Sequence, residues 1–208
     1  MQSFKTVEKP TESEMIIERS RFITLIAPAP TESVARGILS DRKKQHYQAT
    51  HNCYAYMTDN GLITKCSDDG EPSGTAGAPI LSAINAAGLS GVIVVVTRYF
   101  GGIKLGAGGL TRAYLRCATE AIKKADVKTL YLAEVLKTDL SYDEYKAFSR
   151  FKSQGFKVIS TEYSDRVYMT LAVKSGAIGR FSNDFIDFYK GKVAFERVKS
   201  EYIGFDEE

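Results

Sequence analysis

The chain has 208 residues and a formal net charge of +3, and its composition is 44% hydrophobic and 25% charged. These values are typical of a globular protein with one large or two small domains, and so small a charge indicates nucleic-acid binding only where basic residues cluster. No apolar run approaches the roughly 20 residues that cross a bilayer, and the N-terminus lacks the apolar core of a signal peptide. Three cysteines without a C-x-x-C pair indicate reduced thiols. We therefore expect a cytoplasmic protein that does not enter a membrane.

The first part of the chain predicts a mixed α and β domain. An Asn-Gly pair between two apolar stretches favours a primed hairpin turn, and an unbroken run of β-branched residues is typical of a strand covered on both faces. In chain order we expect a long strand (13–30), a helix capped by Thr31 and extending to about residue 48, a hairpin around D-N-G (59–61), a helix closed by Gly88, and a buried strand (92–96).

The helix that follows a glycine-rich segment has the clearest periodicity in the chain. Its apolar residues recur at i, i+3, i+4 and i+7, which predicts one buried face. The residues on this face are Leu110, Ala113, Tyr114, Cys117, Ala118, Ala121 and Ile122.

A second unit is expected to begin near residue 131. Ser141 and Glu144 form a capping box for a helix that extends to Gln154, and three phenylalanines mark one face of a later helix. The expected strands are 132–140, 156–163, 166–173 and 192–205, and the phenylalanines are Phe181, Phe185 and Phe188. The order β-α-β-β-α-β is that of a ferredoxin-like domain.

The segment RYFGGIKLGAGGLTRAY (98–114) points to anion binding. Five of the nine residues from 101 to 109 are glycine, and the only charged residues in the segment are Arg98, Lys104 and Arg112. Glycines allow a ligand to approach the backbone, and a helix start presents unpaired N–H groups, so phosphate or carboxylate is the expected ligand. The spacing is not that of a P-loop or of a dinucleotide-binding fingerprint. A tight turn between a strand and a closely packed helix explains the same glycines, and both interpretations stay open.

A second glycine-containing loop, CSDDGEPSGTAGAP (66–79), carries the carboxylates Asp68, Asp69 and Glu71, together with Thr75. These carboxylates could bind Mg²⁺, transfer protons, pair with the arginines of the first loop, or cap turns. Pairing or capping is the favoured interpretation, because no recognised metal-ligand spacing is present.

Two further patterns are weaker. His46, His51, Cys53 and Cys66 suggest zinc, but four ligands at a recognised spacing are missing, so we expect no metal and no cofactor. The basic run DRKKQHY (41–47) is typical of a solvated helix end, and it could also form part of a nucleic-acid patch.

The segments SDDGEPSGTAGAPIL and VVVTRYFGGIKLGAGGLTRAY resemble the signature of the YigZ/IMPACT family. The core of that signature matches Arg98 to Gly102 with Leu105 and Gly106, and its acidic element matches residues 68–72. The resemblance covers nearly the whole chain and implies an α+β fold with two domains. Residues 1–130 would be similar to the second domain of ribosomal protein S5, and residues 131–208 would be ferredoxin-like, as in the last domain of elongation factor G.

The resemblance also implies a functional direction, since the eukaryotic relatives regulate translation by competing for the activator of a starvation-sensing initiation-factor kinase. Bacteria lack that kinase, so the partner does not transfer. Our first hypothesis is a translation-associated, non-enzymatic binding protein whose partner is the ribosome or RNA. Its phosphate-binding candidates are Arg98, Lys104 and Arg112 with Gly101, Gly102 and Gly106. Its stacking candidates are Tyr99 and Phe100, at least one of which is expected to pack in the core beside the β-branched strand instead.

Two alternatives remain. One is a hydrolase-type enzyme that acts on a small anionic substrate, with the acidic loop handling protons or a metal. The other is a protein–protein regulator in translation control that does not contact nucleic acid. The residues identify no nucleophile–base pair and no catalytic group, and they leave the oligomeric state open.

Overall fold

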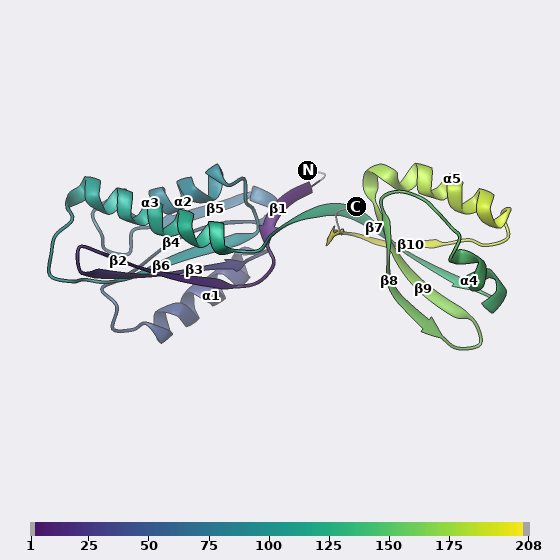
Figure 1. Ribbon diagram of the computed structural model, residues 1–208, viewed down its shortest axis with the longest axis horizontal. Helices are drawn as coiled ribbons and strands as arrows, with labels where there is room; N and C mark the ends of the chain where they lie inside the picture. Colours follow the sequence, from purple (N-terminus) through teal and green to yellow (C-terminus); the bar gives the residue numbers. More distant parts are fainter. Residues whose placement is uncertain (1–2, 206–208) are drawn as a thin grey trace. The chain divides into compact units, whose positions relative to one another are not determined.

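The computed structural model describes residues 3–205. The chain forms two compact units, one formed by residues 4–128 and one that begins at Thr129 (Figure 1). Both units combine helices with an antiparallel sheet, so the chain has the expected α+β fold in two domains. Across the described chain, no helix combines the length and the apolar character needed to cross a bilayer.

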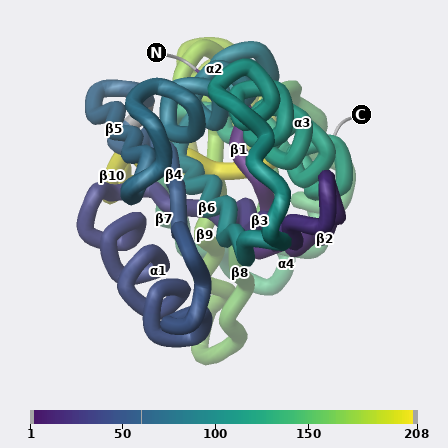
Figure 2. The backbone as a smooth tube through the Cα atoms, turned by 90° about the vertical axis from the view of Figure 1, so that its left-hand side faces the viewer, coloured from purple at the N-terminus to yellow at the C-terminus, as the bar shows by residue number. Residues whose placement is uncertain are grey.

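The first domain is a five-stranded sheet with helices on both faces. The strand order is β2-β3-β6-β4-β5, with β2 Thr11–Ile17, β3 Ser20–Pro28, β4 His51–Thr58, β5 Ile63–Ser67 and β6 Val92–Tyr99. Helices α2 (Gly77–Ala86) and α3 (Gly106–Lys124) cover one face, and α1 (Glu32–Gln45) covers the other (Figures 1 and 2). The short strand β1 (Ser3–Val7) lies beside residues 89–91, where the Ser90 amide donates to the Lys5 carbonyl.

The central strand β6 confirms the prediction of a strand buried on both faces. Val92, Val94 and Val96 pack with α2 and α3, whereas Ile93 and Val95 pack on the α1 side. All seven apolar residues predicted for the face of α3 are buried. The predicted helix cap is also present, because the Thr31 hydroxyl accepts from the Val34 amide at the start of α1.

The long strand predicted over 13–30 is wrong, because this segment forms the hairpin β2–β3. The chain turns at Glu18 and Arg19, which have φ values of 45° and 62°. Two left-handed residues in succession are typical of a primed turn, for which glycine and asparagine are the usual signals. Because neither glycine nor asparagine occurs at this turn, the sequence shows no break between the two apolar strands. The hairpin around D-N-G is confirmed, but the predicted primed turn is wrong, because the turn is a short 3₁₀ segment, Asp59–Gly61, between the paired residues Thr58 and Ile63.

The second domain has the predicted β-α-β-β-α-β order. Its sheet follows β10-β7-β9-β8, and one face carries α4 and α5 over an aromatic core. The elements are β7 Val127–Leu140, α4 Tyr142–Phe148, β8 Phe156–Tyr163, β9 Val167–Lys174, the 3₁₀ segment Ser175–Ala177, α5 Ile178–Tyr189 and β10 Glu196–Gly204.

The capping box of Ser141 and Glu144 is present, but α4 ends at Phe148 and not at Gln154. After Phe148 the chain continues in tight turns, and Phe151 packs its ring against Phe181 in the core. Burial of this ring therefore ends the helix earlier than helix propensity alone predicts.

Candidate functional site

The two glycine-containing loops meet at one end of the first domain's sheet. Strand β6 enters the first loop after Tyr99, and the register places Arg98 beside both Phe22 of β3 and His51 of β4. The second loop returns to the same end, since Asp69 accepts a 2.7 Å hydrogen bond from the Asn52 amide on β4. Tertiary structure therefore joins two segments that are about 30 residues apart in the chain.

A buried ion pair lies beneath the loops. The Arg98 guanidinium donates to the Glu71 carboxylate at 2.6 Å, and the two side chains are only 5% and 4% exposed. The Tyr114 hydroxyl donates to the same carboxylate oxygen at 2.7 Å, and Arg98 also donates to the Ser20 hydroxyl at 3.2 Å. A buried charge that loses its partner is strongly destabilising, so this arrangement holds both loops in place. We call Glu71, Arg98 and Tyr114 the floor of the site.

The phosphate-contact hypothesis requires an exposed Arg98 side chain, but this side chain is buried. Alternation along β6 places its side chain on the same face as Val96, under α2 and α3, where the sheet is covered. Arg98 is 4% exposed and committed to Glu71, so it cannot present its charge to an external phosphate. Its neighbour Tyr99 points to the α1 side, where its hydroxyl lies 2.9 Å from Nδ1 of His46.

The acidic loop uses its carboxylates within the fold, as the pairing and capping interpretation predicts. Asp68 accepts from the amides of Gly74, Ala76 and Gly77 at 2.8–2.9 Å and so caps the start of α2. Burial opposes ionisation of Asp68, but the three backbone donors outweigh it and hold the pKa below its usual value. Asp69 also forms a 2.6 Å ion pair with Lys43.

Thr75 is buried in the same loop, and its hydroxyl donates to the Pro72 carbonyl at 2.6 Å. Each of the four acidic-loop candidates therefore has a partner within the domain. This arrangement favours a structural role for the loop over proton transfer.

His51 and Cys53 lie close to the floor. His51 donates from Nδ1 to the Asp69 carbonyl at 2.8 Å, and its Nε2 lies 3.9 Å from Glu71. The Cys53 thiol donates to the Asp68 carbonyl, and burial raises its pKa to about 12. Such a thiol stays protonated at neutral pH and is a poor nucleophile. Among residues 3–205, no three or more His, Cys, Asp or Glu side chains are placed to hold a metal ion.

The glycine-rich loop has two structurally different parts. A Cβ at Gly101 would lie 2.0 Å from the Arg19 carbonyl oxygen, so only glycine fits where the loop crosses the β2–β3 turn. Gly102 and Gly106 have φ values of 84° and 69°, with open space around them. Gly101 thus makes the tight approach that no other residue allows, while Gly102 and Gly106 are exposed.

Three exposed cations belong to this loop, to the helix that follows it, or to the turn that contacts it. Lys104, Arg112 and Arg19 are exposed, and none of the three forms an ion pair within the part of the chain that the structure describes. Helix α3 begins at Gly106 with no side-chain cap, so its first N–H groups face solvent. We call Lys104, Arg112 and Arg19 the rim of the site. Free donors, a helix start and unpaired positive charge together favour an anion.

Phe100 is the stacking candidate that remains accessible. Its side chain is 47% exposed, and its ring centroid lies 5.5 Å from the Arg98 guanidinium.

Three residues of the site were not predicted from the sequence: Ser20, Tyr114 as a polar group, and Arg19. Ser20 and Arg19 lie in the unrecognised β2–β3 turn, and Tyr114 was assigned to the apolar face of α3 with no signal for its hydroxyl.

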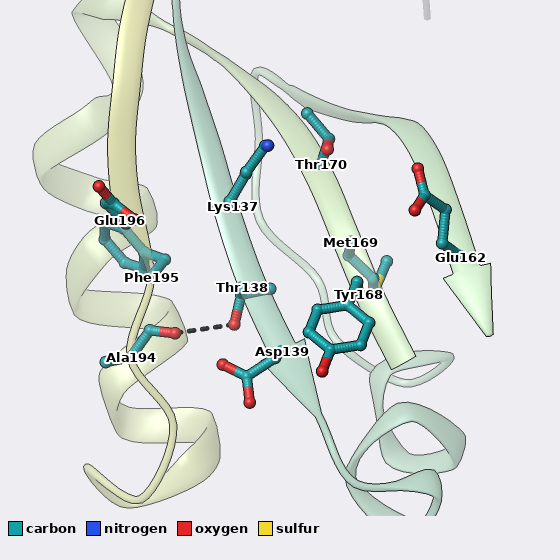
Figure 3. Close-up of a pocket in the computed structure, with 10 residues that line it drawn as sticks. All are labelled: Lys137, Thr138, Asp139, Glu162, Tyr168, Met169, Thr170, Ala194, Phe195 and Glu196. Atoms are coloured by element: carbon teal, nitrogen blue, oxygen red, sulfur yellow. Dashed lines mark hydrogen bonds between the residues drawn. The ribbon is translucent and has the colours of Figure 1, made fainter. Parts of the chain in front are cut away.

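The second domain has a cavity of about 450 Å³ of a different character (Figure 3). Three carboxylates and one lysine line it, with Tyr168 beside them, and the Thr138 hydroxyl donates to the Ala194 carbonyl at 2.7 Å. The carboxylates are Asp139, Glu162 and Glu196. This charge disfavours phosphate, in contrast to the exposed cations of the rim.

Comparison with known proteins gives a consistent result over the whole chain. Residues 18–122 match the Impact N-terminal domain, and residues 140–192 match a domain of unknown function, DUF1949. The chain is 37% identical to the IMPACT family member YvyE of Bacillus subtilis, over 98% of this chain and 94% of that protein. It is 29% identical to YigZ of Escherichia coli, over 93% and 97% of the two chains.

One human protein and one solved structure are also similar to this chain. Protein IMPACT of Homo sapiens is 35% identical over 94 residues, which are 42% of this chain and 29% of that protein. A crystal structure of a hypothetical protein is similar with a TM-score of 0.64 and 28% identity, over 96% of this chain and 98% of that one.

Proposed function

The chain belongs to the IMPACT family, and from that premise we propose that it is a regulatory binding protein of translation that contacts RNA phosphates, as on the ribosome. The contact would be made by the rim and by the first turn of α3. The observation that carries this proposal is the unpaired positive charge of Lys104 and Arg112 on either side of an uncapped, glycine-rich helix start.

The electrostatics of the rim support an extended anion. The three cations of the rim are exposed, and so are glycines 102, 106 and 108, which bring no Cβ between the backbone and a ligand. A phosphate chain offers several acceptors at the spacing of successive nucleotides, and helix starts favour such groups. Phe100, exposed beside the rim, offers a face for a base.

The floor has a different part in this proposal. By pairing with Glu71, Arg98 holds the end of β6 while the Ser20 hydroxyl accepts from the Gly101 amide at 3.2 Å. The loop backbone is thereby ordered before a ligand arrives, which lowers the entropic cost of binding. Arg98 acts through the loop and does not contact the phosphate.

The test is co-sedimentation of the protein with ribosomes across a salt series. The variant is Lys104→Gln with Arg112→Gln, and the matched control is Lys123→Gln with Lys124→Gln, which removes the same charge at the far end of α3. Loss of two phosphate contacts should lower the slope of log affinity against log salt by roughly 1.4 to 1.8. Unchanged binding by the rim variant, or equal loss in the control, would contradict the proposal.

A small anion at the same helix start is the second candidate, because the same exposed N–H groups and cations suit a single phosphate or carboxylate. It predicts an increase in melting temperature with millimolar inorganic phosphate at constant ionic strength. The rim variant should lose that increase, and ribosomes should not bind to the wild type.

A further inference from the structure

A second cationic surface lies on the opposite face of the first domain's sheet. A pocket of about 510 Å³ opens between α1 and the β4–β5 hairpin, within the range of roughly 300–1,000 Å³ that is usual for small-molecule sites. Its lining consists of one face of α1 and three strand residues. These residues are Arg36, Leu39, Ser40, Lys43, Tyr54, Tyr56 and Lys65.

The sequence periodicities explain why these side chains meet. Arg36, Leu39, Ser40 and Lys43 recur at i, i+3, i+4 and i+7 on α1, which places them on one side of the helix. Tyr54 and Tyr56 alternate onto the α1 face of β4, and Lys65 is the partner of Tyr56 in the register with β5. The pocket is thus assembled by regular elements that are well packed below it.

The charge of the lining is positive. Arg36 makes no hydrogen bond or ion pair with any described residue, so all its N–H donors are free for a ligand. Lys43 forms an ion pair with Asp69, and Lys65 forms one with Glu32, each at 2.6 Å. These ion pairs are partly exposed and contribute little to stability, and each ammonium group keeps two further N–H donors for a ligand. No carboxylate belongs to the lining itself.

The lining also offers a flat aromatic face and a free hydroxyl. The rings of Tyr54 and Tyr56 are stacked with centroids 5.9 Å apart and an interplanar angle of 10°. Tyr56 is buried and donates to Glu32, which holds the pair in place, whereas Tyr54 is partly exposed to the pocket. The exposed Ser40 hydroxyl has no partner among the described residues and suits a ribose or phosphate oxygen.

We propose that this pocket binds a nucleoside phosphate, whose base stacks on Tyr54 and whose phosphate contacts the three cationic side chains. Stacking combined with cationic contacts is the usual chemistry of nucleotide recognition without base readout. A free nucleotide and a nucleotide unit of an RNA strand share this chemistry. The site is separate from the rim, because it lies on the α1 face of the sheet and the rim lies at the start of α3.

The test is titration by calorimetry with adenosine monophosphate, adenosine, inorganic phosphate and a short single-stranded RNA. The nucleotide should bind at least about tenfold more tightly than adenosine or phosphate alone, since it uses both halves of the pocket. Arg36→Gln should weaken nucleotide binding about tenfold. Tyr54→Leu should weaken it by a similar factor while leaving the weak binding of phosphate unchanged.

The matched control is Lys44→Gln, which removes one charge from α1 at a residue that does not line the pocket. Binding of the mononucleotide supports the proposal with a free nucleotide as ligand. Binding of RNA alone, weakened by the Arg36 and Tyr54 variants, supports it with RNA as the source. Absence of binding by both probes, or an equal loss in Lys44→Gln, would overturn it.

Failure of this proposal is distinguishable from failure of the proposed function. Lys104→Gln with Arg112→Gln should keep wild-type affinity for the mononucleotide, because those side chains are outside the pocket. Conversely, Arg36→Gln should leave the salt dependence of ribosome binding unchanged, because that dependence is expected to come from the rim. Loss of nucleotide binding in the rim variant would show that the α1 pocket is not the site.

Discussion

Arg98 of the floor and Arg112 of the rim are the same residue type in one short segment but differ in their surroundings. Arg98 is buried, paired at 2.6 Å and surrounded by packed side chains, whereas Arg112 is exposed and has no ion-pair partner among residues 3–205. Position on an element causes this difference. Arg98 is on the covered face of a central strand, and Arg112 is on the outer side of a helix. A signature rich in cations thus combines residues that build a site with residues available to a ligand.

The largest expected effect comes from breaking the floor. Arg98→Met should lower the free energy of unfolding by about 3–5 kcal/mol, because Glu71 would be left charged and buried without its partner. Urea denaturation followed by circular dichroism measures the change. The double variant Glu71→Leu with Arg98→Met should recover much of the loss. A double variant as unstable as the single one would show that the pair itself is not the cause.

The next largest effect on stability is expected at Gly101, which follows Arg98 of the floor and precedes Lys104 of the rim. Gly101→Ala should destabilise the domain by about 1–3 kcal/mol, since its Cβ would overlap the Arg19 carbonyl and force the β2–β3 turn to move. Gly108→Ala is the matched control in the same segment, because its Cβ would meet only the flexible end of Arg112, at an ordinary 3.5 Å, and it lies in a helix. That variant should be neutral or more stable by up to roughly 1 kcal/mol. Thermal unfolding of both variants distinguishes the two glycines.

A smaller effect is expected at Asp68, which anchors the acidic loop beside the floor. Asp68→Asn should cost about 1 kcal/mol at neutral pH, because three backbone amides lose a charged acceptor. The folded-state pKa of Asp68 is lowered from 3.8, so its contribution is present above pH 4 and is lost as pH falls through the folded pKa. The difference between wild type and variant should therefore narrow in acid. A difference that stays constant from pH 7 to pH 2 would contradict this assignment.

The smallest effect on stability is expected at the rim. Lys104→Gln with Arg112→Gln should change the free energy of unfolding by less than about 0.5 kcal/mol, because both side chains are exposed and unpaired in the described structure. The same urea experiment used for Arg98→Met provides the comparison. A loss above 1 kcal/mol would mean that the rim has a structural role, and the contrast between floor and rim would fail.

Local patterns in the sequence were sufficient for much of the fold. The periodicity of α3, the capping box at Ser141, the five-residue β-branched run and the β-α-β-β-α-β order all agree with the structure. Each depends on neighbours within a few residues, so a single sequence contains the necessary information. The IMPACT signature was sufficient for the family for the same reason, since its two motifs are contiguous strings.

The tertiary structure decided which of the candidate residues face solvent. The strand register places Arg98 under α2 and α3, and the return of the acidic loop brings Glu71 to it across 27 residues. The left-handed turn at Glu18 and Arg19 lies against Gly101, and the segment after α4 packs against Phe181, so both involve partners that are distant in the chain. Charge and residue type are properties of the sequence, whereas burial and pairing are properties of the assembled sheet. The sequence by itself therefore determined most of the elements and the family, and only the folded domain separated the floor from the rim.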